Sequence, residues 1–346
     1  MAKQRIIDLP QMRGSYKIYG VVTGYEKENF FTEKPTRNGT MRRAVNFGVK
    51  INKDEDTIFV NLGGMKNDNV YFFRRADKEK GIEKDLKTVP WDQRFTFKEQ
   101  GYSLIGVSTA LTASENGKGK QEYERKVMTP YDACSEISAN LRDDMSITVR
   151  GDLEFSEYNG NHRTNFTINN IRMARTDFDL GAEDYKPISE FHQGIIFMGI
   201  HPDENDHGRF IVDAKIVNYE SIEDAEFVIY EKGLANQFRK ALKPYTYIDT
   251  SGEIKVNKQT EEVETADDWW GEKNTMVTNT APTIRELVIT GANPTTIDKD
   301  TYSEEKIEEA IAKINAKNQA KDDYGSNSAW GDSKKTETFN DDDEPW

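Results

Sequence analysis

Apolar and polar residues alternate with a period of two over much of the first half of the chain. In residues 41–51 (MRRAVNFGVKI), the odd-numbered positions from Val45 to Ile51 are apolar, whereas the even-numbered positions from Arg42 to Lys50 are small, polar or basic. Such alternation sends successive side chains to opposite faces of a β-strand. We therefore predict a strand with one core face, to which Phe47 belongs, and one small and basic face.

The neighbouring segments have the same character. Residues 14–31 are rich in aromatic and β-branched residues, and Asn38-Gly39 marks a tight turn. In residues 57–64 (TIFVNLGG), the alternation predicts a strand with Ile58 inward and Phe59 outward. Residues 70–75 (VYFFRR) either extend the sheet or add a hairpin arm.

A helix and a hairpin follow. Apolar spacing predicts a short helix over residues 130–141, and residues 146–155 and 162–173 pattern as two strands joined by a turn at Asn159-Gly160. Three strands, a helix and a final hairpin are the element order of the oligonucleotide-binding (OB) fold, a five-stranded, partly open barrel. We therefore predict a mainly β protein in which residues 1–178 form an OB-fold domain with elaborations.

The same element order recurs in the second half, without a residue-by-residue repeat. We predict a second OB-like β-domain over residues 179–318, with an acidic insertion at 257–280 and a C-terminal helix. The helix is amphipathic, with one apolar stripe formed by Ile307, Ala310, Ile311 and Ile314. Residues 319–346 have no periodicity and are predicted to form a disordered acidic tail.

Charge is distributed unevenly between these regions. The chain has a net charge of -14, yet residues 1–175 contain 29 Lys+Arg and 24 Asp+Glu, a net of +5, so the remainder carries -19. Such asymmetry points to a nucleic-acid-binding body joined to an acidic appendage. Residues 176–255 hold 8 basic and 16 acidic residues. We therefore interpret the second domain as structural, dimer-forming or partner-binding.

Several classes of protein are disfavoured. The single cysteine, Cys134, cannot form an intrachain disulfide, and it and the four histidines show no zinc-ligand spacing. No segment has the apolar length of a signal peptide or a membrane span. We expect a protein of the bacterial cytoplasm without cofactor or metal.

Aromatic and basic residues interleave at strand spacing in the first domain, as a groove for single strands requires. The candidate DNA-binding residues are Arg42, Lys50, Phe59, Tyr71, Phe73, Arg74, Arg75, Trp91, Arg94, Lys118, Lys120, Arg125, Lys126, Tyr158 and Arg163. Phe59 and Trp91 are the strongest candidates for stacking on bases. The alternative for any single ring is a place in the barrel core, and for the basic loop at 118–126 a solvated charge run.

The chain ends in FNDDDEPW. Four carboxylates stand beside a terminal apolar pair in Asp341, Asp342, Asp343, Glu344, Pro345 and Trp346. A bulky apolar side chain with a free carboxylate on an acidic leash fits a hydrophobic pocket rimmed by basic residues. We predict that this tip binds a partner protein.

The tip is similar to that of bacterial single-stranded DNA-binding proteins, which has the form D-D-D-x-P-F, with Trp in place of Phe. The stretches NVYFFRRADKE, VPWDQRFTFKEQGYSLIGV and DAEFVIYEKGLANQFRKALKPY resemble single-stranded DNA-binding proteins of phages that infect Gram-positive bacteria. The resemblance implies protection of single strands in DNA replication, recombination and repair, and recruitment of a helicase, polymerase or primase by the tip. The doubled length and the acidic second domain depart from the cellular family.

Two other functions stay open. A phage recombination protein that anneals single strands would differ by ring or filament assembly and by faster pairing of complementary strands. Asp152, Glu154 and Glu157 would suggest a metal-dependent nuclease, but no His or Lys completes such a site. Solvent-facing positions on a strand explain these carboxylates better, so we expect no enzymatic activity.

Overall fold

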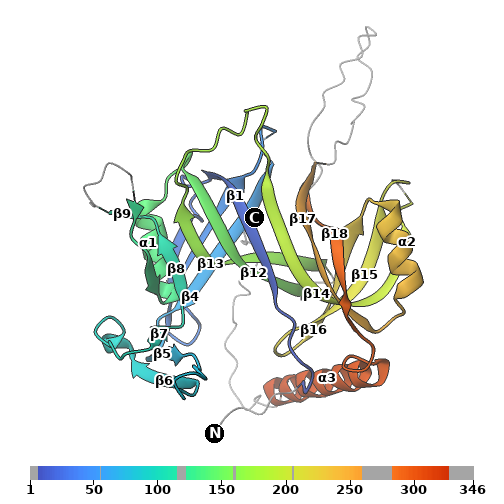
Figure 1. Cartoon of the computed structure of the whole chain (residues 1–346). Coiled ribbons are helices and arrows are strands. Elements are labelled where there is room, and N and C mark those ends of the chain that lie inside the picture. Colours follow the sequence, from blue (N-terminus) through green and yellow to red (C-terminus); the bar gives the residue numbers. More distant parts are fainter. Residues whose placement is uncertain are drawn as a thin grey trace, which may run out of the picture.

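The computed structural model describes residues 7–54, 56–114, 122–158, 161–204, 206–258 and 283–326. Two β-barrels lie side by side, with a small three-stranded arm at the lower end of the first and a long helix below the second (Figure 1). The prediction of a mainly β protein is confirmed.

The first barrel is closed by five strands. These are β1 (Gly14–Thr23), β3 (Met41–Lys50), β4 (Thr57–Met65), β12 (Ser146–Tyr158) and β13 (Asn161–Met173). They pair in the order β1-β3-β4-β13-β12 and back to β1, and only β4–β13 is parallel. The parallel pair, at Asn61 and Thr167, closes the barrel with the topology of an OB fold.

The second barrel repeats this topology. Its strands are β14 (Ile188–Pro202), β15 (Phe210–Val217), β16 (Ile222–Ile229), β17 (Thr246–Lys258) and β18 (Thr283–Asp298). They pair in the order β14-β15-β16-β18-β17 and back to β14, again with one parallel pair, at Val228 and Val288. The predicted second OB-like unit is therefore present.

Each barrel has a helix between its third and fourth core strands. In the first barrel this is α1 (Pro130–Asn140), and in the second it is α2 (Lys232–Ala241). The side chain of Thr129 caps α1 by accepting a hydrogen bond of 3.2 Å from the backbone N–H of Asp132. Both helices pack apolar residues into one continuous core with the barrel strands, whose inward side chains include Phe47.

The first strands of the two barrels join them. β1 and β14 are antiparallel neighbours, with Tyr16 opposite Phe191. On either side of this pair, Ser15 faces His192 and Lys17 faces Glu190, and the latter two form an ion pair of 2.9 Å. Since β1 and β14 are the first strands of their barrels, the two units meet through equivalent strands at the Tyr16–Phe191 pair.

A glycine at a β-bulge marks the same point in both barrels. A side chain on Gly151 would begin 1.8 Å from the carbonyl oxygen of Thr167, and one on Gly252 would begin 1.9 Å from that of Val288. These two glycines lie opposite Tyr16 and Phe191, respectively. Because each bulge brings backbone against backbone, only glycine fits there.

The arm is a separate sheet inserted after β4. It consists of β5 (Asn69–Arg74), β6 (Asp85–Pro90) and β7 (Tyr102–Leu104), with a 3₁₀ turn at Trp91–Gln93. Of the two alternatives predicted for residues 70–75, the hairpin arm is correct. The remaining short strands are β2 (Phe31–Pro35), β8 (Val107–Ala110), β9 (Ala113–Ser114), β10 (Glu122–Tyr123) and β11 (Lys126–Met128).

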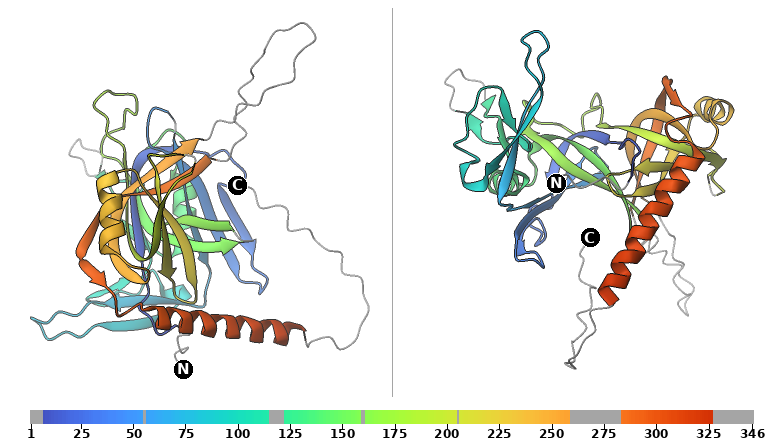
Figure 2. Two further views of the ribbon diagram at one scale, coloured as in Figure 1. Left: turned by 90° about the vertical axis from the view of Figure 1, so that its right-hand side faces the viewer. Right: turned by 90° about the horizontal axis from the view of Figure 1, so that it is seen from below.

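The C-terminal helix α3 (Glu304–Ser326) runs below the second barrel (Figure 2). Its predicted apolar stripe is confirmed, because Ile307 and Ala310 are buried and Ile311 and Ile314 pack against the core. The helix continues to Ser326, past residue 319 where the acidic tail is predicted to begin, and residues 327–346 of that tail lie outside the described chain. None of the described helices is long and apolar enough to span a membrane.

Candidate nucleic-acid interface

The outward face of β3 and β4 carries one exposed aromatic ring. Phe59 is 46% exposed on β4, and its neighbour across the strands is Gly48 on β3. A side chain on Gly48 would begin 3.4 Å from the Phe59 ring and closer still to two threonine methyl groups. Gly48 is buried between the ring and these methyl groups, so this position must stay without a side chain.

Two cations flank this ring. The Nζ of Lys27 lies 5.5 Å from the ring centroid, and the guanidinium carbon of Arg285 lies 4.6 Å from it. Lys27 follows β1, whereas Arg285 comes from β18 of the second barrel, so both barrels contribute to one site.

Arg285 is held in an unusual environment. Its Nε donates a hydrogen bond of 3.3 Å to the carbonyl oxygen of Thr57, and burial lowers the pKa of its guanidinium. Within the described residues it has no carboxylate at ion-pair distance. Because a partly desolvated cation without a counter-charge favours an anion nearby, this position suits a phosphate.

Arg42 and Lys50 share this outward face, as predicted. Arg42 is exposed, and its guanidinium lies over Gly63 of the neighbouring strand, 3.0 Å from where a side chain would begin. Lys50 is half-buried at the other end of β3. The outward positions of both strands include no Asp or Glu; they are Arg42, Ala44, Asn46, Gly48, Lys50, Thr57, Phe59, Asn61, Gly63 and Met65. We call these ten residues the Phe59 face.

Four other predicted residues meet in a groove between the arm and the barrel. Phe73, Arg74, Arg75 and Arg125 all line this space, which has a volume of about 1370 Å³. We call it the arm groove. Tyr71, on the same strand of the arm as Phe73, is 49% exposed.

The prediction for Trp91 is wrong. Its ring is only 8% exposed and packs edge-on against Tyr131 of α1, with ring centroids 5.7 Å apart. Together with Val70, Phe72 and Val89 it forms the small core that fastens the arm to the barrel. A ring held in this way cannot stack on a base.

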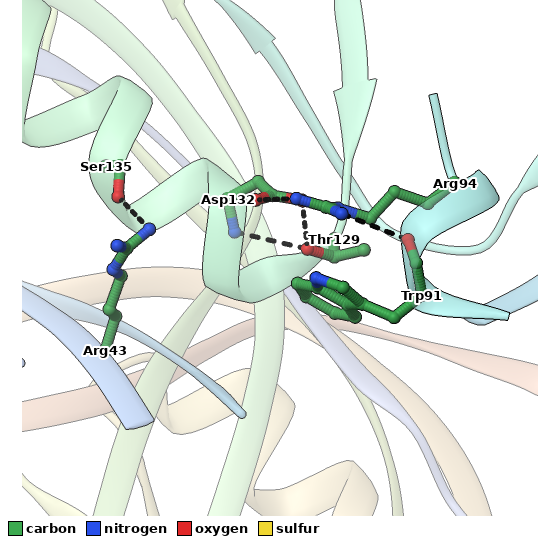
Figure 3. Close-up of polar contacts among 6 residues, drawn as sticks. All are labelled: Arg43, Trp91, Arg94, Thr129, Asp132 and Ser135. Atoms are coloured by element: carbon green, nitrogen blue, oxygen red, sulfur yellow. Dashed lines mark hydrogen bonds and ion pairs between the residues drawn. The ribbon is translucent and has the colours of Figure 1, made fainter. Parts of the chain in front are cut away.

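Arg94 is likewise structural, contrary to prediction. Its Nε and Nη2 donate to the two carboxylate oxygens of Asp132, at 2.7 and 3.1 Å, and its Nη1 donates to the carbonyl oxygen of Trp91 (Figure 3). Arg43, on the other side of α1, donates a hydrogen bond of 2.7 Å to Ser135. These contacts tie the arm and β3 to the start of α1.

The remaining candidates fall into two groups. Lys126 lies 3.4 Å from Glu136 and 3.7 Å from Glu124, so neighbouring carboxylates already neutralise it and the prediction that it clamps DNA is not supported. Arg163 is half-buried on β13, away from the arm groove lining. Outside the described residues or side chains lie Lys118, Lys120, Tyr158 and the tip from Asp341 to Trp346.

Sequence reasoning missed Lys27, Gly48 and Arg285 as parts of the site. Gly48 could have been found from the outward alternation of residues 41–51, since a glycine in a strand often marks a close approach of another group. Arg285 is separated by 226 positions from Phe59, and no local pattern signals that contact.

The carboxylates considered for a nuclease site do not cluster. Asp152 is exposed on β12 and accepts a hydrogen bond of 3.0 Å from Asn169. Among the residues that the structure describes, no group of three or more His, Cys, Asp or Glu side chains could hold a metal ion.

The fold and this surface define a protein of two OB barrels in tandem, with an aromatic and cationic face on the first. A family model described as YorF matches residues 77–327, and the chain belongs to this family.

Two solved structures align with most of this chain. The wild-type single-stranded DNA binding protein from Thermus aquaticus aligns with a TM-score of 0.38 and 10% identity, covering 82% of this chain and 93% of that one. A deletion mutant of the same protein aligns with the same TM-score and identity, over 82% of this chain and 94% of its own. No curated protein sequence matches this chain. The assignment of the fold rests on the strand pairings described above.

Proposed function

We propose that this protein binds single-stranded DNA, with little sequence preference, across the Phe59 face during phage DNA replication or recombination. The observation that carries the proposal is the exposed ring of Phe59, set beside Gly48 and between the cations of Lys27 and Arg285. Stacking accepts any unpaired base because every base has a π-face, and cations accept the phosphates.

The cations on the ring do not exclude a base. A base on the open part of the ring replaces only weak cation–π contacts, each about 0.5–1 kcal/mol at an exposed site. The displaced cations then gain a phosphate as partner, a charge-assisted contact that is stronger. In the absence of DNA, Lys27 and Arg285 therefore keep the site positively charged.

The test is a titration of the full chain with labelled single- and double-stranded oligonucleotides at two salt concentrations. We expect tighter binding of single strands, and an affinity that falls by about 0.7 log units per log unit of salt for each neutralised phosphate. Equal affinity for the duplex, or binding that ignores salt, would contradict the proposal.

A matched pair of variants locates the site. Phe59→Ala should weaken binding by about 1–3 kcal/mol if the ring stacks on a base. Tyr219→Ala removes an equally exposed ring, 49% against 46%, from the second barrel and should leave the affinity unchanged. Normal thermal unfolding of both variants is the control for folding.

We further propose that the tip from Asp341 to Trp346 recruits a replication protein. Support comes from the sequence alone: four carboxylates precede a C-terminal aromatic residue. In pull-down with a candidate helicase, polymerase or primase, Trp346→Ala should lose the partner, because the apolar anchor is gone. It should keep the wild-type affinity for single-stranded DNA, and loss of that affinity would place the tip in the DNA site.

A further inference from the structure

The arm groove has two walls of different character. One wall is the arm, which contributes Phe73, Ser103, Leu104 and Ile105. The other is the barrel, where Asn169 and Asn170 of β13, Ser108 of β8 and Val127 of β11 line the groove. The arm hangs at the lower end of the first barrel, on the side away from the second barrel (Figures 1 and 2).

The outward face of the arm sheet, from which Phe73 lines the groove, presents apolar side chains in a row that extends beyond the groove lining. Pairing places Phe73 between Leu86 and Ser103 on the outward face of the sheet, and Tyr71 follows on the same face. Two residues along a strand span roughly 6.6 Å, so the two aromatic rings are spaced for neighbouring bases. Leu86 and Ile105 beside them are each 55% exposed.

The groove is rich in cations. Five basic residues line it, against two acidic ones; the basic residues are Arg74, Arg75, Lys78, Lys80 and Arg125. Asp77, one of the two acids, pairs with Lys80 at 3.3 Å.

Few interactions within the protein hold the side chains of the three arginines, Arg74, Arg75 and Arg125. In the part of the chain that the structure describes, none of them lies within ion-pair distance of a carboxylate. Arg125 donates a hydrogen bond of 3.0 Å to Ser108, and the guanidinium of Arg74 lies 4.9 Å from the ring centroid of Tyr102. This excess of basic residues suits the phosphates of a nucleic acid. Because aromatic rings for stacking lie beside the basic residues, the groove favours a single-stranded nucleic acid over an acidic peptide.

The groove continues the Phe59 face along β13. Asn61, two residues from Phe59, is the neighbour of Thr167 on β13. Three residues further along β13, Asn170 lies beside Ser108, to which Arg125 is bonded. The path from Phe59 through Asn61, Thr167 and Asn170 to Ser108, beside Arg125, is about 26 Å long, given about 3.3 Å per residue along a strand and 4.8 Å between strands.

We propose that the arm groove is a second subsite for the same DNA strand, reached only by oligonucleotides long enough to leave the Phe59 face. This inference rests on the proposed function and adds a length dependence to it. Arg75 and Arg125 take phosphates, while Phe73 and Tyr71 stack on bases.

The test compares two lengths of oligothymidylate, about 8 nucleotides, within the range covered by one OB barrel, and about 30 nucleotides. The variant is Arg75→Ala with Arg125→Ala in the full chain. We expect wild-type affinity for the short strand, about tenfold weaker binding of the long one, and a salt slope for the long strand smaller by about 1.4, which is two phosphates at 0.7 each.

The matched control is Arg239→Ala with Lys240→Ala, which removes the same charge from the exposed side of α2. It should leave both lengths unaffected. Equal losses on both lengths in the Arg75/Arg125 variant would mean that general electrostatics, not a subsite, explains the effect, and no loss on either would remove the groove from the DNA path. Both results would leave the proposed function intact, whereas a wild-type chain that binds neither length would refute the function itself.

Discussion

The two barrels have the same pattern of strand pairing but differ in the side chains on the outward faces of their strands. The parallel pairs Asn61–Thr167 and Val228–Val288 close them at equivalent points. Two residues before Asn61 stands Phe59, and two residues before Val228 stands Glu226. The position of Phe59 in the first barrel is thus taken by an exposed carboxylate in the second.

The neighbours differ in the same direction. The residue opposite Glu226 is Asp213, where the first barrel has Gly48 opposite Phe59. Two residues along from Asp213, Lys215 forms an ion pair of 2.6 Å with Asp224. The equivalent residues of the first barrel are Lys50 and, opposite it, the uncharged Thr57. A phosphate would meet three carboxylates on this face of the second barrel, so we infer that it does not hold DNA.

The inward residues of the same strands are alike in kind. Ile58 and Val60 on β4 correspond to Ala225 and Phe227 on β16, and all four are buried. The barrel core constrains only the inward half of each strand, because alternate side chains never meet it. The outward half can therefore change from an aromatic and basic face to an acidic one without altering the fold.

The sharpest way to break this comparison is to place the second barrel's residue in the first. Phe59→Glu should weaken single-strand binding by about 100-fold, since it removes roughly 1–3 kcal/mol of stacking and adds repulsion of phosphate. Fluorescence titration at low salt measures the loss. The control, Glu226→Gln, neutralises the carboxylate of the second barrel and should tighten DNA binding by less than about twofold. A large effect of Glu226→Gln would show that the second barrel touches DNA.

The second prediction concerns what the barrels have in common. Gly151→Ala and Gly252→Ala should each lower the free energy of unfolding by about 1–3 kcal/mol, because the new methyl group meets a backbone carbonyl that cannot move freely. Urea unfolding measures both. Gly199→Ala is the control, since its nearest contact is 3.4 Å and it should be tolerated. If only one of the two bulge glycines proved sensitive, the equivalence of the bulges would be wrong.

The sequence predicts well which strand side chains face the core, but it predicts the residues of the site only in part. Alternation in residues 41–64 assigned Phe47 to the core and Phe59 to the outside, because period-two burial is a local property of a strand. It misjudged Trp91, whose burial depends on the distant Tyr131 of α1. The same limit applies to Arg94, since nothing near it in the sequence announces Asp132 as its partner.

The order of the elements predicts that the second barrel repeats the first, but a residue-by-residue comparison of the two halves does not. The equivalence of Gly151 and Gly252 depends on backbone registers that only the pairing reveals. Around them the repeat keeps hydrophobic character and little identity, as GDLEF at 151–155 against GEIKV at 252–256 shows. Cores tolerate such exchange when volume and pattern are kept.

The prediction with the smallest expected effect concerns α1 and α2, the equivalent helices of the two barrels. α1 is followed by Leu141 and α2 by Leu242, both buried at the C-cap, and seven residues before them stand Cys134 and Ala235, both fully buried. Cys134→Ala therefore installs the second barrel's residue. At pH 7 it should cost about 1 kcal/mol of unfolding free energy, the ordinary size of a single substitution.

The pH dependence gives this variant a distinctive signature. Burial raises the pKa of the Cys134 thiol to about 12, and its sulfur lies 3.4 Å from the carbonyl oxygen of Leu62. An unfolded thiol titrates near about 8.5, so between these values the folded state keeps a proton that the unfolded state releases. The wild type should therefore lose about 1.4 kcal/mol per pH unit relative to Cys134→Ala above about pH 8.5, and the order of stability should reverse near about pH 9–10. Chemical unfolding of both proteins at pH 7 and pH 10 measures the difference. A constant difference across this range would mean that the thiol is not shielded in the folded protein, and that α1 packs less closely on its barrel than α2 does.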